Sequence, residues 1–195
     1  PGAVVRGLTI KGGRLNTFDH GGAGLDLQAG VVSNCVITGN SGYTQGAGVR
    51  LAGGLLMACE VTGNAATSPS PGYGAGAGLY ITGGTAMWCR VFGNTTVREG
   101  GGANVLGGLL SHSLILTNVS TTTDISGGGI VMSGGEVRNC LIANNGAAKT
   151  IIGGGICMRG GVVSSCTIAN NQAQISGGGI DKSGGYVTNS LICFN

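Results

Sequence analysis

The chain has 195 residues, of which 43 are glycine, only three are proline and 42% are hydrophobic, and its formal net charge is +3. So much glycine without a strict Gly-X-Y period excludes collagen, and the hydrophobic content excludes a disordered chain. Because only 9% of the residues are charged and the ten Lys and Arg are scattered, we expect no nucleic-acid partner.

The sequence carries no targeting or membrane signal that we can identify. None of its apolar stretches reaches the roughly 18 to 20 residues that a membrane helix needs. The opening residues PGAVVRGLTI lack the charged and apolar regions of a signal peptide, and the first residue is not Met. We therefore expect residues 1–195 to form one domain that is a segment of a longer protein, without a membrane span.

One glycine-rich unit recurs along the chain with a mean period of about 26 residues. Its first clear copy is GGAGLDLQAGVVSNCVITGN at 21–40, and later copies include GGGIVMSGGEVRNCLIANN at 127–145 and GGGICMRGGVVSSCTIANN at 153–171. The spacing varies only between an asparagine and the next glycine cluster. Such a repeat is typical of a solenoid, in which every copy forms one coil.

Two columns of the repeat stand out when its seven copies are aligned. The first holds cysteine in five copies and serine in the other two: Cys35, Cys59, Cys89, Ser113, Cys140, Cys166 and Ser190. The second holds asparagine in every copy: Asn40, Asn64, Asn94, Asn118, Asn145, Asn171 and Asn195. Glycine columns lie eleven and five residues before the cysteine column, and they too are unbroken.

Each copy predicts three short strands. Apolar residues alternate over runs of two to five residues, as in Leu25 and Leu27 or Cys166 and Ile168, which is strand periodicity. Gly-Gly or Asn bounds each run and accepts positive φ at a sharp bend. Stacking the coils in register predicts four inward apolar columns, which begin at Leu25, Leu27, Val32 and Ile37 and which only Lys182 interrupts. The fold class is therefore all-β, a parallel β-helix of about seven coils.

The combination of GGGI, a turn and CxIxxN resembles the repeats of pectin-lyase-like proteins. More narrowly, GGAG at 21–24 with ITGN at 37–40 resembles the repeat signals of polymorphic outer-membrane proteins and autotransporter passengers. The resemblance covers nearly the whole chain, and it implies a right-handed, single-stranded β-helix that is bacterial and extracellular or at the cell surface. It does not specify a function, because this scaffold carries lyases, hydrolases and adhesins.

The two repeated columns are interpreted as structural. The asparagines predict a hydrogen-bonded ladder, so the sequons NTT at 94–96 and NVS at 118–120 are read as a by-product of that ladder. The column cysteines predict buried, unreactive thiols. Cys157 and Cys193 fall in outward or edge columns and are expected to be the more reactive pair.

The acidic residues do not converge on a catalytic or metal site. GGAGLD at 21–26 matches part of a calcium-binding nonapeptide, but the match occurs once and the next coil places Arg50 beside Asp26. We expect the ion pairs Asp26–Arg50 and Glu60–Arg90, and no carboxylate pair for glycoside hydrolysis. His20 and His112 lack a neighbouring acid or nucleophile. We therefore predict no catalytic residue, no metal and no cofactor.

The remaining candidate site is a polar and aromatic patch near the longest loop, residues 65–75. It comprises Arg50, Tyr73, Tyr80 and Asn104, which would suit sugar stacking, although ordinary solvated surface is the competing interpretation.

The favoured function is a noncatalytic extracellular or cell-surface segment, a rigid spacer or an adhesive stalk, with glycans or cell-surface molecules as partners. The alternative is a fragment of a polysaccharide-binding or polysaccharide-degrading protein whose acidic coils lie outside this segment. Neither end carries a polar cap, so we also expect end-to-end self-association of the isolated chain.

Overall fold

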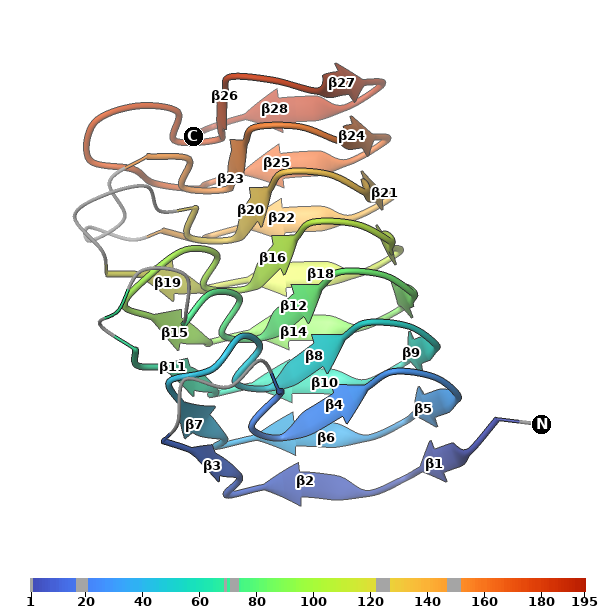
Figure 1. Cartoon of the computed structure of the whole chain (residues 1–195). Helices are drawn as coiled ribbons and strands as arrows, with labels where there is room; N and C mark the ends of the chain where they lie inside the picture. The colour runs from blue at the N-terminus through green and yellow to red at the C-terminus, as the bar shows by residue number, and fades with distance from the viewer. Residues whose placement is uncertain (1, 17–20, 69, 71–73, 122–126, 147–151) are drawn as a thin grey trace.

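The computed structural model describes residues 2–16, 21–68, 70, 74–121, 127–146 and 152–195. Tyr73, His20, Asp19 and Asp124 lie outside these residues. The described chain is all-β and winds as a right-handed parallel solenoid of about seven coils, which confirms the predicted fold class (Figure 1).

Three sheets run the length of the solenoid, and every coil contributes one three-residue strand to each of them. Sheet A consists of β1 (Val4–Arg6), β5 (Val31–Ser33), β9 (Leu55–Met57), β13 (Thr85–Met87), β17 (Leu109–Ser111), β21 (Glu136–Arg138), β24 (Val162–Ser164) and β27 (Tyr186–Thr188). Sheet B consists of β2 (Thr9–Lys11), β6 (Val36–Thr38), β10 (Glu60–Thr62), β14 (Arg90–Phe92), β18 (Leu114–Leu116), β22 (Leu141–Ala143), β25 (Thr167–Ala169) and β28 (Leu191–Cys193). Sheet D consists of β4 (Leu25–Leu27), β8 (Val49–Leu51), β12 (Leu79–Ile81), β16 (Ala103–Val105), β20 (Ile130–Met132), β23 (Ile156–Met158) and β26 (Ile180–Lys182).

A fourth sheet was not predicted. Sheet C consists of five two-residue strands, β3 (Arg14–Leu15), β7 (Ser41–Gly42), β11 (Ala65–Ala66), β15 (Thr95–Thr96) and β19 (Val119–Ser120). From β7 onward its strands directly follow the asparagine column and run into the loop of variable length. Two residues are too few to show an alternation of apolar and polar side chains, so the sequence carries no periodic signal for them.

The strands stack in register, and the predicted columns are the observed ones. Ile115, Ile142 and Ile168 are partners in neighbouring coils of sheet B, and all three are fully buried. The inward side chains of the three long sheets form one continuous core. Lys182, the one polar member of these columns, is exposed in the last coil as expected.

The sharp bends are made at the expected glycines, as at Gly30 and Gly108, but beside the asparagines they are made one residue earlier than expected. The ladder asparagines do not themselves adopt positive φ; the residue before each of them does, as in Gly39, Thr117 and Asn170. The residue before each cysteine-column position also has positive φ, as in Trp88 and His112. These two left-handed bends, together with those at the glycines, deliver the column residues of each coil to their places.

The glycine column eleven residues before the cysteine column is explained by close packing between coils. A Cβ atom on Gly102 would lie 2.6 Å from the carbonyl oxygen of Gly129 and 2.8 Å from Nδ2 of Asn118. No larger residue fits without displacing backbone. Nowhere among the described residues does a helix reach the length and hydrophobicity of a transmembrane span.

Candidate functional site

The seven asparagines form an uninterrupted ladder through the molecule. From Asn64 onward, each Oδ1 accepts two hydrogen bonds from the asparagine of the preceding coil, one from its backbone N–H and one from its Nδ2, at 2.9–3.1 Å. Oδ1 of Asn40 accepts from the backbone N–H of Gly13 at 2.9 Å. Each Nδ2 also donates to a carbonyl of the coil before, as from Asn118 to Val91 at 2.9 Å. Asn94 and Asn118, the two sequon residues, are fully buried in this ladder.

The cysteine column is a second ladder, whose role the sequence reasoning missed. The backbone N–H of Cys89 donates to Oγ of Ser113 at 3.0 Å, and Ser113 Oγ donates to the carbonyl of Ser111 at 2.6 Å. Cysteines do the same with sulfur: the backbone amide of Cys59 hydrogen-bonds to the thiol of Cys89, whose Sγ lies 3.4 Å from the carbonyl of Met87. The alternation of Cys with Ser was the available signal, because both side chains can donate and accept.

The column thiols are free, and burial or a neighbouring thiol raises the pKa of three of them. Burial raises the pKa of Cys89 to about 12 and also raises the pKa of Cys59. The adjacent Cys166 thiol, together with burial, raises the pKa of Cys140. A thiol must lose its proton to act as a nucleophile, so the raised pKa values keep Cys59, Cys89 and Cys140 chemically quiet. The pKa of Cys166 is instead lowered, because its thiol hydrogen-bonds to that of Cys140.

Every described carboxylate has a partner. Both predicted ion pairs are present, Arg50 with Asp26 at 2.9 Å and Arg90 with Glu60 at 3.3 Å. Glu99 binds Arg159 at 2.8 Å, and Glu136 lies 3.8 Å from Arg138 in the same strand.

Asp181 and Asp26 also take part in hydrogen bonds to uncharged groups. Asp181 accepts a hydrogen bond from Ser176 at 2.8 Å. Asp26 accepts a further hydrogen bond from Gln28 at 3.1 Å, so its oxygens are already occupied. Within the described part of the chain, no cluster of three or more His, Cys, Asp or Glu could hold a metal ion.

His112 lies on the surface between aromatic and amide neighbours. One ring nitrogen is 3.2 Å from Nδ2 of Asn139, and the ring centroid is 6.3 Å from that of Trp88. The three residues belong to one column, at the left-handed bend before the cysteine column. Among the described residues, the contacts of this ring include no nucleophile for it to activate and no carboxylate.

The structure brings three of the four predicted ligand residues together on sheet D, but it does not expose two of them. Arg50, Tyr80 and Asn104 occupy one outward position of β8, β12 and β16, in register. Only 7% of Tyr80 and 6% of Asn104 is accessible, so the tyrosine ring cannot offer a face to a sugar. The expected exposed patch is therefore wrong in this respect, because loops cover the outer face of sheet D.

We call this outward column the sheet D row. It runs from Asp26 through the three residues above to Val131, Cys157 and Asp181. Tyr80 and Asn104 have no side-chain hydrogen bond to a described residue, and Nε of Arg50 is buried without a partner. Burial raises the pKa of Tyr80, so its hydroxyl stays protonated. Tyr80 and Asn104 thus present uncharged donors and acceptors at buried positions in the middle of the row.

The prediction that Cys157 and Cys193 form a reactive pair is corrected for Cys157. Its side chain does point outward from sheet D, but only 3% of the residue is accessible, and burial raises the pKa of its thiol. Cys193, in β28 of sheet B, is half-buried. The sequence correctly predicts that the Cys157 side chain points outward from the sheet. It does not predict that loops cover this face.

The ion pair Glu99–Arg159 was not predicted. Its residues lie 60 positions apart, in the loop before β16 and in the turn after β23. The loop lengths vary between copies, so the repeat alignment does not place Glu99 relative to any later coil.

No family model, no curated protein and no solved structure matches this chain.

Proposed function

We propose that the chain is a noncatalytic, extracellular or cell-surface β-solenoid segment that acts as a rigid spacer or adhesive stalk. The proposal rests on one observation, which is that the polar side chains of the repeated columns and the described carboxylates already have partners within the solenoid. The asparagine and cysteine/serine columns are committed to ladders, and the described carboxylates are held by arginines or a serine. Residues that are committed in this way hold coils together and leave little for acid–base chemistry.

Stiffness follows from the same contacts. Each coil bonds to its neighbours through three long sheets and two side-chain ladders, so bending at one coil would break several of these at once. A solenoid advances about 4.8 Å per coil, which suits a part whose task is to set a distance. The cell-surface location rests on the resemblance of the GGAG and ITGN signals to autotransporter passengers and polymorphic outer-membrane proteins.

Enzyme assays test the noncatalytic part of the proposal. We expect no turnover of polygalacturonate or related acidic glycans by this chain, with or without calcium. An unsaturated, ultraviolet-absorbing product would contradict the noncatalytic proposal if the chain itself makes it. The activity would then disappear in Asp26→Asn or Arg50→Gln and persist in the matched controls Glu60→Gln and Arg90→Gln.

Cell attachment tests the adhesive part. The chain, displayed on a nonadherent cell, should increase attachment to surfaces coated with glycans or matrix proteins. If it does not, the spacer role remains testable by scattering, in which a rigid rod of fixed length is expected and a flexible chain would contradict the proposal.

Polysaccharide binding is the second candidate, and the sheet D row favours it. The Tyr80 hydroxyl and the Asn104 amide lack side-chain hydrogen bonds to described residues, and such groups form hydrogen bonds with sugar hydroxyls. A glycan panel should then give a signal that Asn104→Ala removes and that Asn139→Ala, on the exposed bend of another face, retains.

Self-association of the isolated chain is proposed as well. Ile192 in the last coil is 48% accessible, whereas its column equivalents Ile142 and Ile168 in inner coils are fully buried. At the other end, the inward residues Val5 and Ile10 are only partly buried. Sedimentation over a wide concentration range should show dimers or larger species, and a monomer throughout would contradict this.

A further inference from the structure

The four middle positions of the sheet D row, Tyr80 to Cys157, are buried, although outward positions on the other sheets are open. Val131 is fully buried and Cys157 is 3% accessible. In contrast, Leu114 on sheet B is 36% accessible and Arg138 on sheet A is exposed. The cover therefore belongs to sheet D and is not a property of the coils.

Part of the cover is backbone. A Cβ atom on Gly127 would lie 2.5 Å from Cγ2 of Val131, and one on Gly153 would lie 2.7 Å from the Cα atom of Cys157. These glycines precede β20 and β23 and pack directly on the row. A contact of this kind is fixed by the path of the chain and does not open easily.

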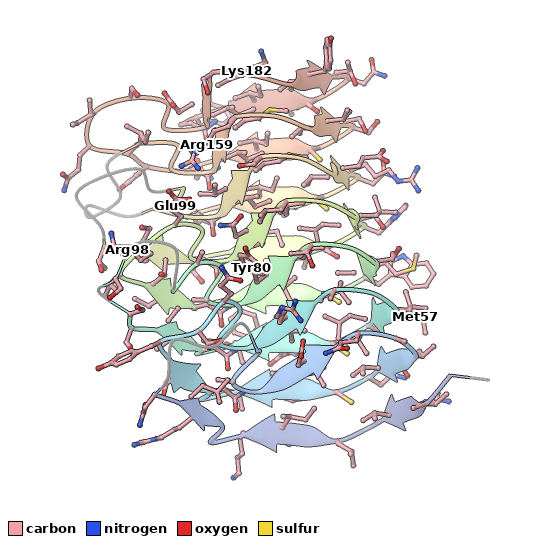
Figure 2. The ribbon with its side chains drawn as sticks, in the orientation of Figure 1. Met57, Tyr80, Arg98, Glu99, Arg159 and Lys182 are labelled. Carbon is pink, nitrogen blue, oxygen red and sulfur yellow. The ribbon has the colours of Figure 1, made fainter. Side chains whose placement is uncertain are left out.

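The ion pair between Glu99 and Arg159 flanks the same row. Arg159 follows Cys157 by two residues, and a Cβ atom on Gly100, next to Glu99, would lie 3.2 Å from the backbone nitrogen of Asn104. Burial raises the pKa of both Tyr80 and Cys157, and the carboxylate of Glu99 raises both further. Arg159 lowers the pKa of Cys157, because its positive charge and its hydrogen bond to the thiol both favour the thiolate. The pair is thus within electrostatic range of the row at two of its positions, and Figure 2 shows Tyr80, Glu99 and Arg159 on the same face of the molecule.

This ion pair differs from the other described ones in its reach. Arg50–Asp26 and Arg90–Glu60 join adjacent coils, and Arg138–Glu136 lies within one strand. Arg159 and Glu99 belong to coils separated by the coil of β20, so their side chains bridge across it. About a third of each side chain is accessible, at 34% and 29%.

We propose that Glu99 and Arg159 form a latch over the sheet D row, and that the latch opens without unfolding of the coils beneath it. The sheets and ladders do not use either side chain, so releasing the pair leaves the solenoid intact. A partly exposed pair shifts such an equilibrium by a factor of about two to five. The latch controls access to the row whether or not the proposed function is correct.

Cys157 is a built-in reporter of opening, and Cys140 is its internal control. Both residues are 3% accessible, but Cys157 points outward under the latch whereas Cys140 points into the core. Labelling by N-ethylmaleimide, followed by peptide mass spectrometry, gives a separate rate for each thiol in the same sample.

Arg159→Gln is the decisive variant. Arg159 lowers the pKa of Cys157, so its removal makes the thiol itself less reactive. Faster labelling in this variant can therefore come only from greater exposure. We expect labelling of Cys157 to rise about two- to fivefold in Arg159→Gln and in Glu99→Gln, with the Cys140 rate unchanged.

The matched control is Arg90→Gln, which removes the corresponding partner of an ion pair on sheet B and should leave both rates unchanged. Sodium chloride at high concentration should accelerate labelling of Cys157 in the unmodified chain but not in Arg159→Gln. Unchanged or slower labelling of Cys157 in Arg159→Gln overturns the proposal. Equal acceleration of Cys157 and Cys140 also overturns it, because the whole coil would then be loosening.

Discussion

Replacing Ile142 by Asp should damage the solenoid far more than replacing Thr167 by Asp. Ile142 is fully buried between Ile115 and Ile168, whereas Thr167 occupies an outward, half-buried position of the next coil of the same sheet. A carboxylate at residue 142 would have to lose its water or its charge, and nothing in that column could pair with it. The two residues lie in neighbouring strands of the same sheet, so the comparison tests the direction of the side chain.

The magnitude can be bounded from a milder change at the same site. Ile142→Ala removes buried methyl groups and should cost about 2 to 5 kcal/mol. Ile142→Asp should exceed the upper end of that range, whereas Thr167→Asp should stay within about 1 kcal/mol. For a chain of this size, 1 kcal/mol corresponds to roughly 2 to 4 °C in Tm.

Thermal unfolding followed by circular dichroism measures all three variants. If Ile142→Asp does not fold, Ile142→Ala still orders the two sites, because its loss should exceed that of Thr167→Asp by several degrees. Equal Tm values for Ile142→Ala and Thr167→Asp would refute the assignment of inward and outward columns.

Three further outcomes follow from the ladders. Asn118→Ala leaves the two donors of Asn94 without their acceptor and should cost about 3 kcal/mol in urea unfolding, and a loss under about 1 kcal/mol would contradict the ladder. Cys89→Ser should be tolerated better than Cys89→Ala, because Ser113 already fills this role, and the reverse order in denaturation midpoints would show that the thiol only packs. The raised pKa of Cys89, about 12 against 9.0, means that the folded state holds its proton more tightly than the unfolded state. That stabilisation is complete below pH 9 and is lost as the pH rises toward 12, so the unfolding free energy should fall over this range, and less steeply in Cys89→Ser.

The repeat explains why the fold could be read from the sequence. In a stacked solenoid one residue type recurs at one place in every coil, so Ile115, Ile142 and Ile168 reveal the core without any knowledge of distant contacts. The ion pair Asp26–Arg50 followed from the same register. Both features depend only on which residues occupy equivalent positions in neighbouring coils, and an alignment of the copies shows those positions.

Features that do not repeat from coil to coil could not be predicted from the sequence. Sheet C is built from two-residue strands that show no alternation, and the loops over sheet D have no fixed length. The burial of Tyr80 and Asn104 and the reach of Arg159 to Glu99 depend on those loops. Periodicity gives the side of the sheet on which a residue lies, but it does not say what lies above that side.

The distribution of repeated and unrepeated residues indicates where a specific function of this chain should be sought. A residue that is the same in every coil serves the stacking, as the fully buried Asn118 does through its five ladder hydrogen bonds. The sheet D row is the opposite case, since Arg50, Tyr80, Asn104 and Cys157 share one position and have four different chemistries. The stacking of sheet D uses their backbone and places no demand on their side chains, so their variety is not explained by the fold. Because the Glu99–Arg159 pair lies over this same row, a ligand search should compare the unmodified chain with Arg159→Gln: if the row binds a ligand, opening the latch should increase its affinity, and equal affinity would place the binding site elsewhere.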